Sequence, residues 1–433
     1  MSYPVTCVSR IRTAAYCACV LSIVPWTSVY AQPVASLSLA QAVRIARERS
    51  AQIPAQEDAA TASREMAVAA RQLPDPTLKL GLSNLPVDGV DRFTLSRDFM
   101  TMRTIAVMQE FTRSDKRTAR ASRLEQEARV VEANRELMIA NLQRETAIAW
   151  LERFYSEQMR ALLVQQQDEA KLQIEASDSV YKTGRGSQSD VFAARTSVAQ
   201  IEDRIAQIDR QLLAAKARLS RWVGEAGGRS LDRPPAMDQS PVSPAQLDGD
   251  MDHHPQIAVL QRQEDVAQAD VVIAQSNKRS DWSAELMFSQ RGSAYSNMIS
   301  FNVSIPLQWD QPNRQDRELA AKLAMAAQAR ATTEEAMRDH TVELRMMVIE
   351  WQSNRERLLR HDNTLIPLAD ERTRAVLAAY RGGAGTLSTV LEARRGEIDA
   401  QMERLRLQMD TARVWAQLQY VSAAANGNPP AQP

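Results

Sequence analysis

The sequence YKTGRGSQSDVFAAR, from Tyr181 to Arg195, returns about half a chain length later as YRGGAGTLSTVLEAR, from Tyr380 to Arg394. Each copy is a glycine-containing turn between two long stretches that have the composition of helices. Glycine suits such a turn because it takes positive φ angles without strain. Internal repeats outrank local signals in deciding a fold, so the sequence predicts two copies of one unit.

The duplication extends upstream of the two turns. Leu37–Gln72 has apolar residues at helical spacing and ends at Pro74-Asp75-Pro76, which cannot continue a helix. A related segment begins at Pro255, where Gln256-Ile257 corresponds to Gln52-Ile53. Each half of the chain is therefore predicted to begin with a helix.

After each of these helices the apolar spacing changes from the helical period to a period of two. Apolar residues alternate with polar or small ones in residues 76–86 and 103–111 of the first half and in residues 281–290 and 297–309 of the second. Strands of about ten residues with one apolar face are typical of the wall of a membrane barrel. Half-buried strands of a soluble sheet share this pattern, so the strands alone leave both interpretations open.

The helices that follow the strands are unusually long. Residues 114–180 and 312–379 contain almost no glycine or proline, apart from Pro312 at the start of the second stretch and Pro367 within it. At about 1.5 Å per residue, some 65 helical residues extend on the order of 100 Å, which exceeds the needs of a globular domain.

Four strands cannot close a barrel, and lipid does not tolerate an open sheet edge. Three copies would supply about twelve strands and leave room for a pore.

The N-terminus predicts export. Arg10 and Arg12 precede an apolar run, and small residues before Ala31 resemble a cleavage site, so residues 1–31 are predicted to be a secretory signal peptide. A short buried N-terminal helix is the alternative. The three cysteines of the chain, Cys7, Cys17 and Cys19, lie within this segment. The mature chain would then have no disulfide framework and no thiolate metal site.

Composition argues against two classes of function. The 53 basic and 53 acidic residues cancel, and nucleic acid binding requires a net basic face. Four scattered histidines, without a glycine-rich phosphate loop or a zinc-spaced cluster, do not assemble an enzyme site or a cofactor site. His253-His254 stands at a helix entry, but no further ligand lies at helical spacing from it, so no metal site is expected there.

The ordered set of elements resembles one family. Helix, strand pair, long helix, Tyr-x-x-Gly turn and second helix, in duplicate, are similar to the outer membrane factor (TolC-like) proteins of bacterial efflux and type I secretion systems. The resemblance runs from LSLAQAVRIA to WAQLQYVSAA. MRTIAVMQEFTRSDKRTAR and ISFNVSIPLQWDQPNRQDR look like the family's second strand of each pair running into a helix.

This resemblance implies a mainly α protein with a small membrane β part. The family forms a homotrimer with a 12-stranded β-barrel in the outer membrane of Gram-negative bacteria, in contact with its lipid, and a long α-barrel in the periplasm. It has no enzymatic activity and no cofactor. Its partners are a periplasmic adaptor (membrane fusion) protein and an inner membrane transporter, here expected to be of the resistance-nodulation-division type.

The resemblance also implies a division of the chain into segments. Residues 32–223 form the first repeat, with its helical hairpin at 114–223, and residues 255–424 form the second, with its hairpin at 312–424. Residues 224–254 are expected to be an irregular connector, and residues 425–433 a disordered tail.

In this family, a tyrosine, a basic residue and acidic residues near the second turn close the channel. Tyr380 and Glu392 match that pattern, and Asp190 matches the acidic position in the first copy. Gly385 stands where the basic residue would be and Thr389 where an acid would be, which puts the usual ion-pair latch in doubt. The alternative is that Asp190 only caps its helix and Glu392 is solvated. The exposed turn tips are the expected adaptor contacts: Tyr181, Gly184, Arg185, Gly186, Ser187, Arg381, Gly383, Gly385 and Thr386.

Three methionines bear on which substrate the protein transports. Met100, Met102 and Met108 share the parity of Thr104 and Ala106 in a predicted strand, on the expected lumen face. A thioether suits Cu(I) or Ag(I), although methionine is also a common packing residue. Overall similarity favours the heavy-metal branch of the family (CzcC/CusC-like).

Other interpretations remain open. Multidrug efflux or type I secretion are the alternatives within the family, and a soluble periplasmic coiled-coil adaptor or scaffold is the alternative of another class.

Overall fold

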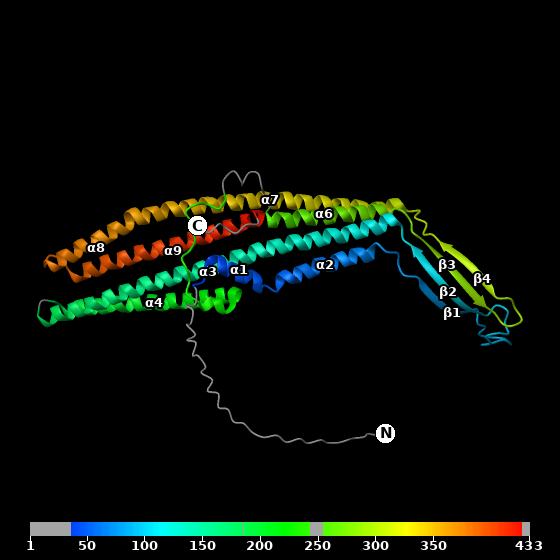
Figure 1. The fold of residues 1–433 in the computed structure, drawn as a ribbon, viewed down its shortest axis with the longest axis horizontal. Helices are drawn as coiled ribbons and strands as arrows, with labels where there is room; N and C mark the ends of the chain where they lie inside the picture. Colours follow the sequence, from blue (N-terminus) through cyan, green and yellow to red (C-terminus); the bar gives the residue numbers. More distant parts are fainter. Residues whose placement is uncertain (1–35, 185, 243–253, 427–433) are drawn as a thin grey trace, which may run out of the picture. The chain divides into compact units, whose positions relative to one another are not determined.

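The computed structural model describes residues 36–184, 186–242 and 254–426. The predicted signal peptide, the tip residue Arg185, residues 243–253 of the predicted connector and residues 427–433 of the predicted tail lie outside the described residues. Within them, the prediction of a mainly helical chain with a small sheet is confirmed (Figure 1).

The two halves repeat one order of elements. The first half contains α1 (Leu39–Arg49), α2 (Gln52–Ala70), β1 (Thr77–Ser83), β2 (Met102–Phe111), α3 (Ser114–Lys182), α4 (Gln188–Val223) and the short η1 (Gly224–Gly228). The second contains α6 (Pro255–Ser276), β3 (Trp282–Gln290), β4 (Met298–Ser304), η3 (Gln311–Asn313), α7 (Gln315–Arg360), η4 (His361–Leu365), α8 (Ile366–Arg381) and α9 (Leu387–Asn426).

The predicted first helical stretch is divided into two helices. Ser38 begins α1 with a capping box, in which its hydroxyl accepts from the backbone N–H of Gln41. Ser50 then takes an extended conformation, and α2 begins at Gln52. Proline lacks a backbone N–H and fits only the first turn of a helix, so Pro54 explains why the helix restarts here instead of continuing.

Two predicted strands end earlier than the alternation of their sequences indicates. β4 stops at Ser304 and not at residue 309, because Pro306 cannot donate to a strand ladder. β1 stops at Ser83, where Asn84 turns the chain with a φ of 56°. The apolar alternation of Ile305 and Leu307 therefore continues beyond the strand itself.

The long helix of the second half contains one irregular turn. Pro367 cannot donate to the carbonyl four residues earlier, and the chain forms the π-helical turn η4 directly before it. α7, η4 and α8 therefore form one continuous helical run, and its hydrogen-bond pattern changes at η4. Among the described residues, no helix is both long and apolar enough to cross a membrane.

The four strands pair antiparallel in the order β1-β2-β3-β4. One face carries two rows of apolar side chains, all exposed: Leu80, Ile105, Phe288 and Ile299, and next to them Leu78, Val107, Leu286 and Phe301. The opposite face carries the rows Lys79, Ala106, Met287 and Ser300, and Gly81, Thr104, Ser289 and Met298. The sheet therefore has one apolar face and an opposite face of polar, small and methionine side chains, called the polar face below. Within the described residues, its two edges, β1 and β4, have no further neighbouring strand.

The buried core lies along α3, which packs against α1, α2, α4, α6 and α9. Trp150, Leu151 and Leu219 are fully buried there, and the Trp150 indole donates to the carbonyl of Leu37 at 3.0 Å. Arg153 donates to the carbonyls of Gly227 and Arg229, both at 2.7 Å. These bonds attach the chain segments before and after the hairpin to the middle of α3.

Candidate functional site

The first candidate site is the turn that joins α3 to α4. Gly184 has a φ of 74°, which favours glycine, and its N–H donates to the carbonyl of Tyr181 at 2.9 Å. A Cβ on Gly186 would lie 3.3 Å from the backbone nitrogen of Tyr181. Ser187 then caps α4 in a capping box with Asp190, each side chain accepting from the other's backbone N–H at 3.2 Å. The positive φ therefore favours glycine at 184, and a side chain at position 186 would press on the neighbouring turn of α3.

The turn that joins α8 to α9 has the same backbone. Gly383 has a φ of 76°, and a Cβ on Gly385 would lie 3.0 Å from the nitrogen of Tyr380. Gly383 donates to the carbonyl of Tyr380, and the following residue donates to the carbonyl of Ala379, which is the Schellman arrangement. The duplicated sequence therefore gives Gly184 and Gly383 the same positive φ and the same hydrogen bond to the tyrosine three residues earlier.

The two turns differ in their caps. In the second turn Thr386 takes the place of Ser187 and Thr389 the place of Asp190, and the two threonine hydroxyls lie 2.7 Å apart. The first turn of α4 thus carries a carboxylate, whereas α9 has none at the corresponding position. An anionic group near a helix N-terminus is favoured by the helix dipole, so the Asp190 cap is the stronger of the two.

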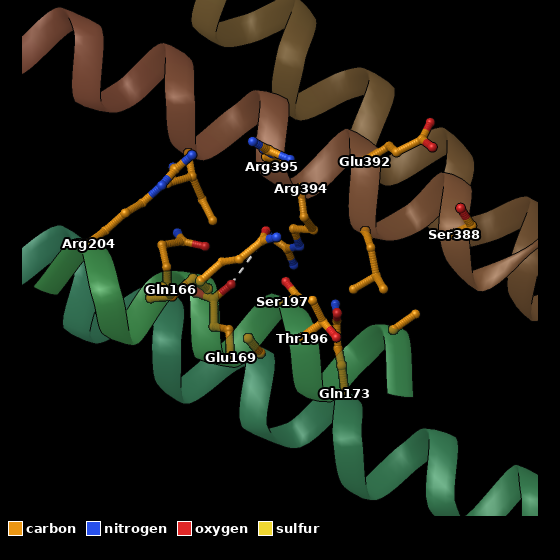
Figure 2. Close-up of a pocket in the computed structure, with 16 residues that line it drawn as sticks. Gln166, Glu169, Gln173, Thr196, Ser197, Arg204, Ser388, Glu392, Arg394 and Arg395 are labelled. Atoms are coloured by element: carbon orange, nitrogen blue, oxygen red, sulfur yellow. Dashed lines mark ion pairs between the residues drawn. The ribbon is translucent and has the colours of Figure 1, made fainter. Parts of the chain in front are cut away.

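A polar groove lies near these turns, between α9 and the hairpin of α3 and α4 (Figure 2). It encloses a volume of about 390 Å³. Figure 2 shows Glu392 and Arg394 of α9 on one side of it and Glu169 of α3 on the other. Arg394 pairs with Glu169 at 3.3 Å, and Arg204 of α4 pairs with Asp399 of α9 at 2.6 Å. Two ion pairs therefore connect the second hairpin to the first across this groove.

The predicted constriction residues are placed in different surroundings. Asp190 is half-buried in its capping box, Tyr380 is half-buried at the end of α8, and Glu392 is exposed at the edge of the groove. The structure thus supports the capping role of Asp190, while its predicted role as a channel constriction stays a prediction. In the described structure, no hydrogen bond or ion pair joins Asp190, Tyr380 and Glu392 to one another.

The lumen role of the three predicted methionines stays a prediction, but the structure shows where they lie relative to the sheet. Met102 and Met108 lie in β2 on the polar face of the sheet. Met100 does not, because the Asp98 carboxylate accepts from the backbone N–H of Met100 and of Thr101, both at 2.9 Å. This turn ends the strand alternation before Met102, and Met100 lies exposed in the loop. Met287 and Met298, which the sequence did not single out, share the polar face.

The ion pairs across the groove were also missed. Arg394 stands out in the sequence only as part of the repeat, and its partner Glu169 lies far away in the chain. Such pairs leave no local pattern in a sequence with 106 charged residues, counted as 53 basic plus 53 acidic. Within the described part of the chain, no group of three or more His, Cys, Asp or Glu side chains is arranged to hold a metal ion.

Comparison with known proteins gives a match in structure but not in sequence. No protein-family model matches the chain, and no curated protein matches it. The outer-membrane channel OprN aligns over 88% of this chain and 89% of its own, at 16% identity and a TM-score of 0.74. The outer membrane protein VceC from Vibrio cholerae aligns over 88% and 95%, at 18% identity and a TM-score of 0.73.

A third solved structure, the transmembrane channel CusC, aligns over 88% of this chain and 91% of its own, at 15% identity and a TM-score of 0.74. At these identities the likeness concerns the arrangement of the backbone. The chain therefore has the fold of outer membrane channels such as OprN and VceC.

Proposed function

We propose that this protein is an outer membrane factor: the outer membrane exit duct of a tripartite efflux pump in a Gram-negative bacterium. It would conduct substrates passively from a periplasmic adaptor protein and an inner membrane transporter to the outside. A duct of this kind carries out no bond chemistry and needs no cofactor. The fold shared with outer membrane channels supports this proposal.

The single observation that carries it is the sheet. Eight large apolar side chains form two adjacent rows on one face, all exposed, while the opposite face carries polar, small and methionine side chains. An exposed apolar face of this kind is unfavourable in water and favourable in lipid. The unpaired edges β1 and β4 are excluded from lipid unless they pair. Three copies joined edge to edge, about twelve strands in all, would satisfy both requirements and enclose a pore.

Fractionation tests this proposal. The protein, expressed with its own N-terminal segment in a Gram-negative host, is separated into outer membrane, inner membrane and soluble periplasmic fractions. We expect it in the outer membrane, migrating in unheated gels as a trimer that dissociates on boiling. Recovery as a soluble periplasmic protein would instead favour the coiled-coil adaptor or scaffold.

For the substrate, we propose heavy-metal cations. Met102, Met108, Met287 and Met298 share the polar face of the sheet, which would face the lumen of the proposed barrel. Thioethers are soft ligands that favour Cu(I) and Ag(I) over hard cations. Single methionines along a wall would contact such ions weakly and repeatedly, as conduction requires.

A susceptibility profile tests the substrate. A deletion strain is exposed to copper, silver, zinc, cobalt and cadmium salts and to a panel of dyes and antibiotics, then complemented with the gene. We expect sensitivity confined to the metal salts. Sensitivity confined to organic compounds would instead indicate multidrug efflux, and loss of a secreted protein would indicate type I secretion.

The hairpin tips are the proposed adaptor contacts, and Asp190, Tyr380 and Glu392 the proposed constriction. Asp190→Asn keeps an oxygen that can accept from the Ser187 N–H and removes only the charge, whereas Asp190→Ala removes both. If Asp190 controls ion passage, both variants change single-channel cation selectivity. If it serves only as a cap, Asp190→Asn conducts like the wild type.

A further inference from the structure

An ion pair crosses the polar face of the sheet. Nζ of Lys79 in β1 lies 2.5 Å from a carboxylate oxygen of Glu285 in β3. The strand between them is β2, where Ala106 lies opposite Lys79 and Met108 lies opposite Glu285. The two charges therefore meet over β2 and not between neighbouring strands.

The small side chain of Ala106 explains how this pair can form. Strands two apart in a sheet are separated by about 10 Å, so Lys79 and Glu285 have to lean toward one another. Ala106 projects only a methyl group from the strand between them and is 4% exposed, which agrees with long side chains lying over it. The side chains of Lys79 and Glu285 are themselves 49% and 20% exposed. Both charges therefore remain accessible to a solute that passes along this face.

The pair contains the cation of this face. In the described strands, the charged side chains on the polar face are Lys79, Glu110 and Glu285. Glu110 is exposed near the end of β2 that leads into α3, opposite Ser283. One positive and two negative charges leave the face with a net charge of one negative charge per protomer. Loss of Lys79 or of Glu285 would change this net charge in opposite directions.

The pair is not expected to decide whether the sheet forms. An ion pair that solvent reaches contributes little to stability, because water and salt screen its charges and two long side chains lose their freedom. The backbone register of β1, β2 and β3 holds the strands together without it. Removal of either charge should therefore leave an assembled protein in which the effect on passing ions can be measured.

We propose that Lys79 and Glu285 set the charge selectivity of the duct, because Lys79 neutralises the Glu285 carboxylate and withholds it from passing cations. This inference rests on the proposed function, in which the polar face lines the lumen and each of three protomers contributes one pair. A ring of free carboxylates in a pore favours cations over anions. Neutralised carboxylates let cations pass without holding them, and conduction requires such weak binding.

Reversal potentials of single channels in a potassium chloride gradient measure this selectivity. Lys79→Gln gives the face two net negative charges per protomer, so its reversal potential should move toward that of K⁺. Glu285→Gln leaves no net charge, so its reversal potential should move toward that of Cl⁻. The double variant has the wild-type net charge and should return close to the wild-type value. Both single shifts should be larger in dilute salt, since the Debye length falls from about 10 Å at 0.1 M to about 3 Å at 1 M.

Two further variants serve as controls. Lys79→Arg keeps the positive charge and should keep the wild-type reversal potential. Arg103→Gln removes the cation that the described strands carry on the apolar face, where Arg103 lies opposite Leu82 and Gln290. Because that face would lie outside the lumen, selectivity should not change. If Lys79→Gln does not assemble, Lys79→Met removes the same charge with a different side chain.

The outcomes separate this inference from the proposed function. Opposite shifts in the two single variants, with recovery in the double variant, would support the role of the pair. Unchanged potentials, or shifts in the same direction in both single variants, would overturn it, because a merely structural pair would act alike from either side. If the wild-type protein formed no channel at all, the proposed function would fail and this inference with it.

Discussion

Arginine placed on either face of the sheet tests which face meets lipid. Phe301 stands at the centre of β4 on the apolar face, 69% exposed, and Ser300 beside it points to the polar face opposite Met287. An arginine on the lipid face at the bilayer midplane costs about 2–4 kcal/mol, and one facing a lumen costs little. Since the proposed trimer would contain the site three times, Phe301→Arg should destabilise it by roughly 6–12 kcal/mol.

The assay compares both variants with the wild type during folding into lipid vesicles. The fraction of heat-dissociable trimer is followed on unheated gels over a range of denaturant concentrations. We expect Phe301→Arg to give almost no trimer and Ser300→Arg to fold close to the wild-type level. Equal losses in both variants, or a larger loss for Ser300→Arg, would refute the assignment of the apolar face to lipid.

Three further changes test the turns, the helix contacts and the core. Gly385→Ala places a Cβ 3.0 Å from a backbone nitrogen and should lower stability by about 1–3 kcal/mol in thermal melts, whereas Gly382→Ala, with its nearest atom at 3.5 Å, should not. Burial raises the pKa of Asp270, but hydrogen bonds from Lys322 and Arg123 lower it overall. Asp270→Asn should therefore cost about 1.5 kcal/mol at neutral pH in denaturant unfolding, and this difference should shrink as the pH falls below about 4. Trp150→Phe should cost about 2–3 kcal/mol in melts followed by circular dichroism, since it removes a buried hydrogen bond and leaves a void, while the half-exposed Trp222→Phe should have little effect.

Much of the fold could be predicted because its signals are local. The turns at Gly184 and Gly383 depend on φ angles of 74° and 76°, which only glycine adopts freely. The strands follow from alternation, and the long helices from the scarcity of glycine and proline. The duplication adds weight to each signal, because the same order of elements is read twice.

The ends of the elements were less predictable. Alternation continues through Ile305 and Leu307, but Pro306 removes the hydrogen bond that would extend β4. Met100 has the right parity for β2, yet the Asp98 side chain binds its backbone and turns the chain. In both cases a hydrogen-bonding requirement of the backbone overrides a pattern of side chains.

The candidate site itself was predictable in position but not in its contacts. The tips lie where the repeated glycines indicate, whereas the pairing of Arg394 with Glu169 and of His254 with His340 depends on how the helices pack. The partners in each pair lie on different helices, and the sequence contains many residues of the same types. The packing of the helices decides which of them meet, and no spacing rule in the sequence predicts it.

The two turns share their glycine geometry but differ in the side chains that cap the following helices. Gly186 and Gly385 approach the nitrogens of Tyr181 and Tyr380 in the same way, so the backbone of the turn is common to both halves. The caps are not, because Asp190 accepts from the N–H of Ser187 while Thr389 in the second copy brings no charge. The repeated glycines are therefore explained by the backbone geometry of these two turns. Whatever distinguishes one hairpin from the other, for an adaptor or for a passing ion, has to come from the side chains that changed after the duplication.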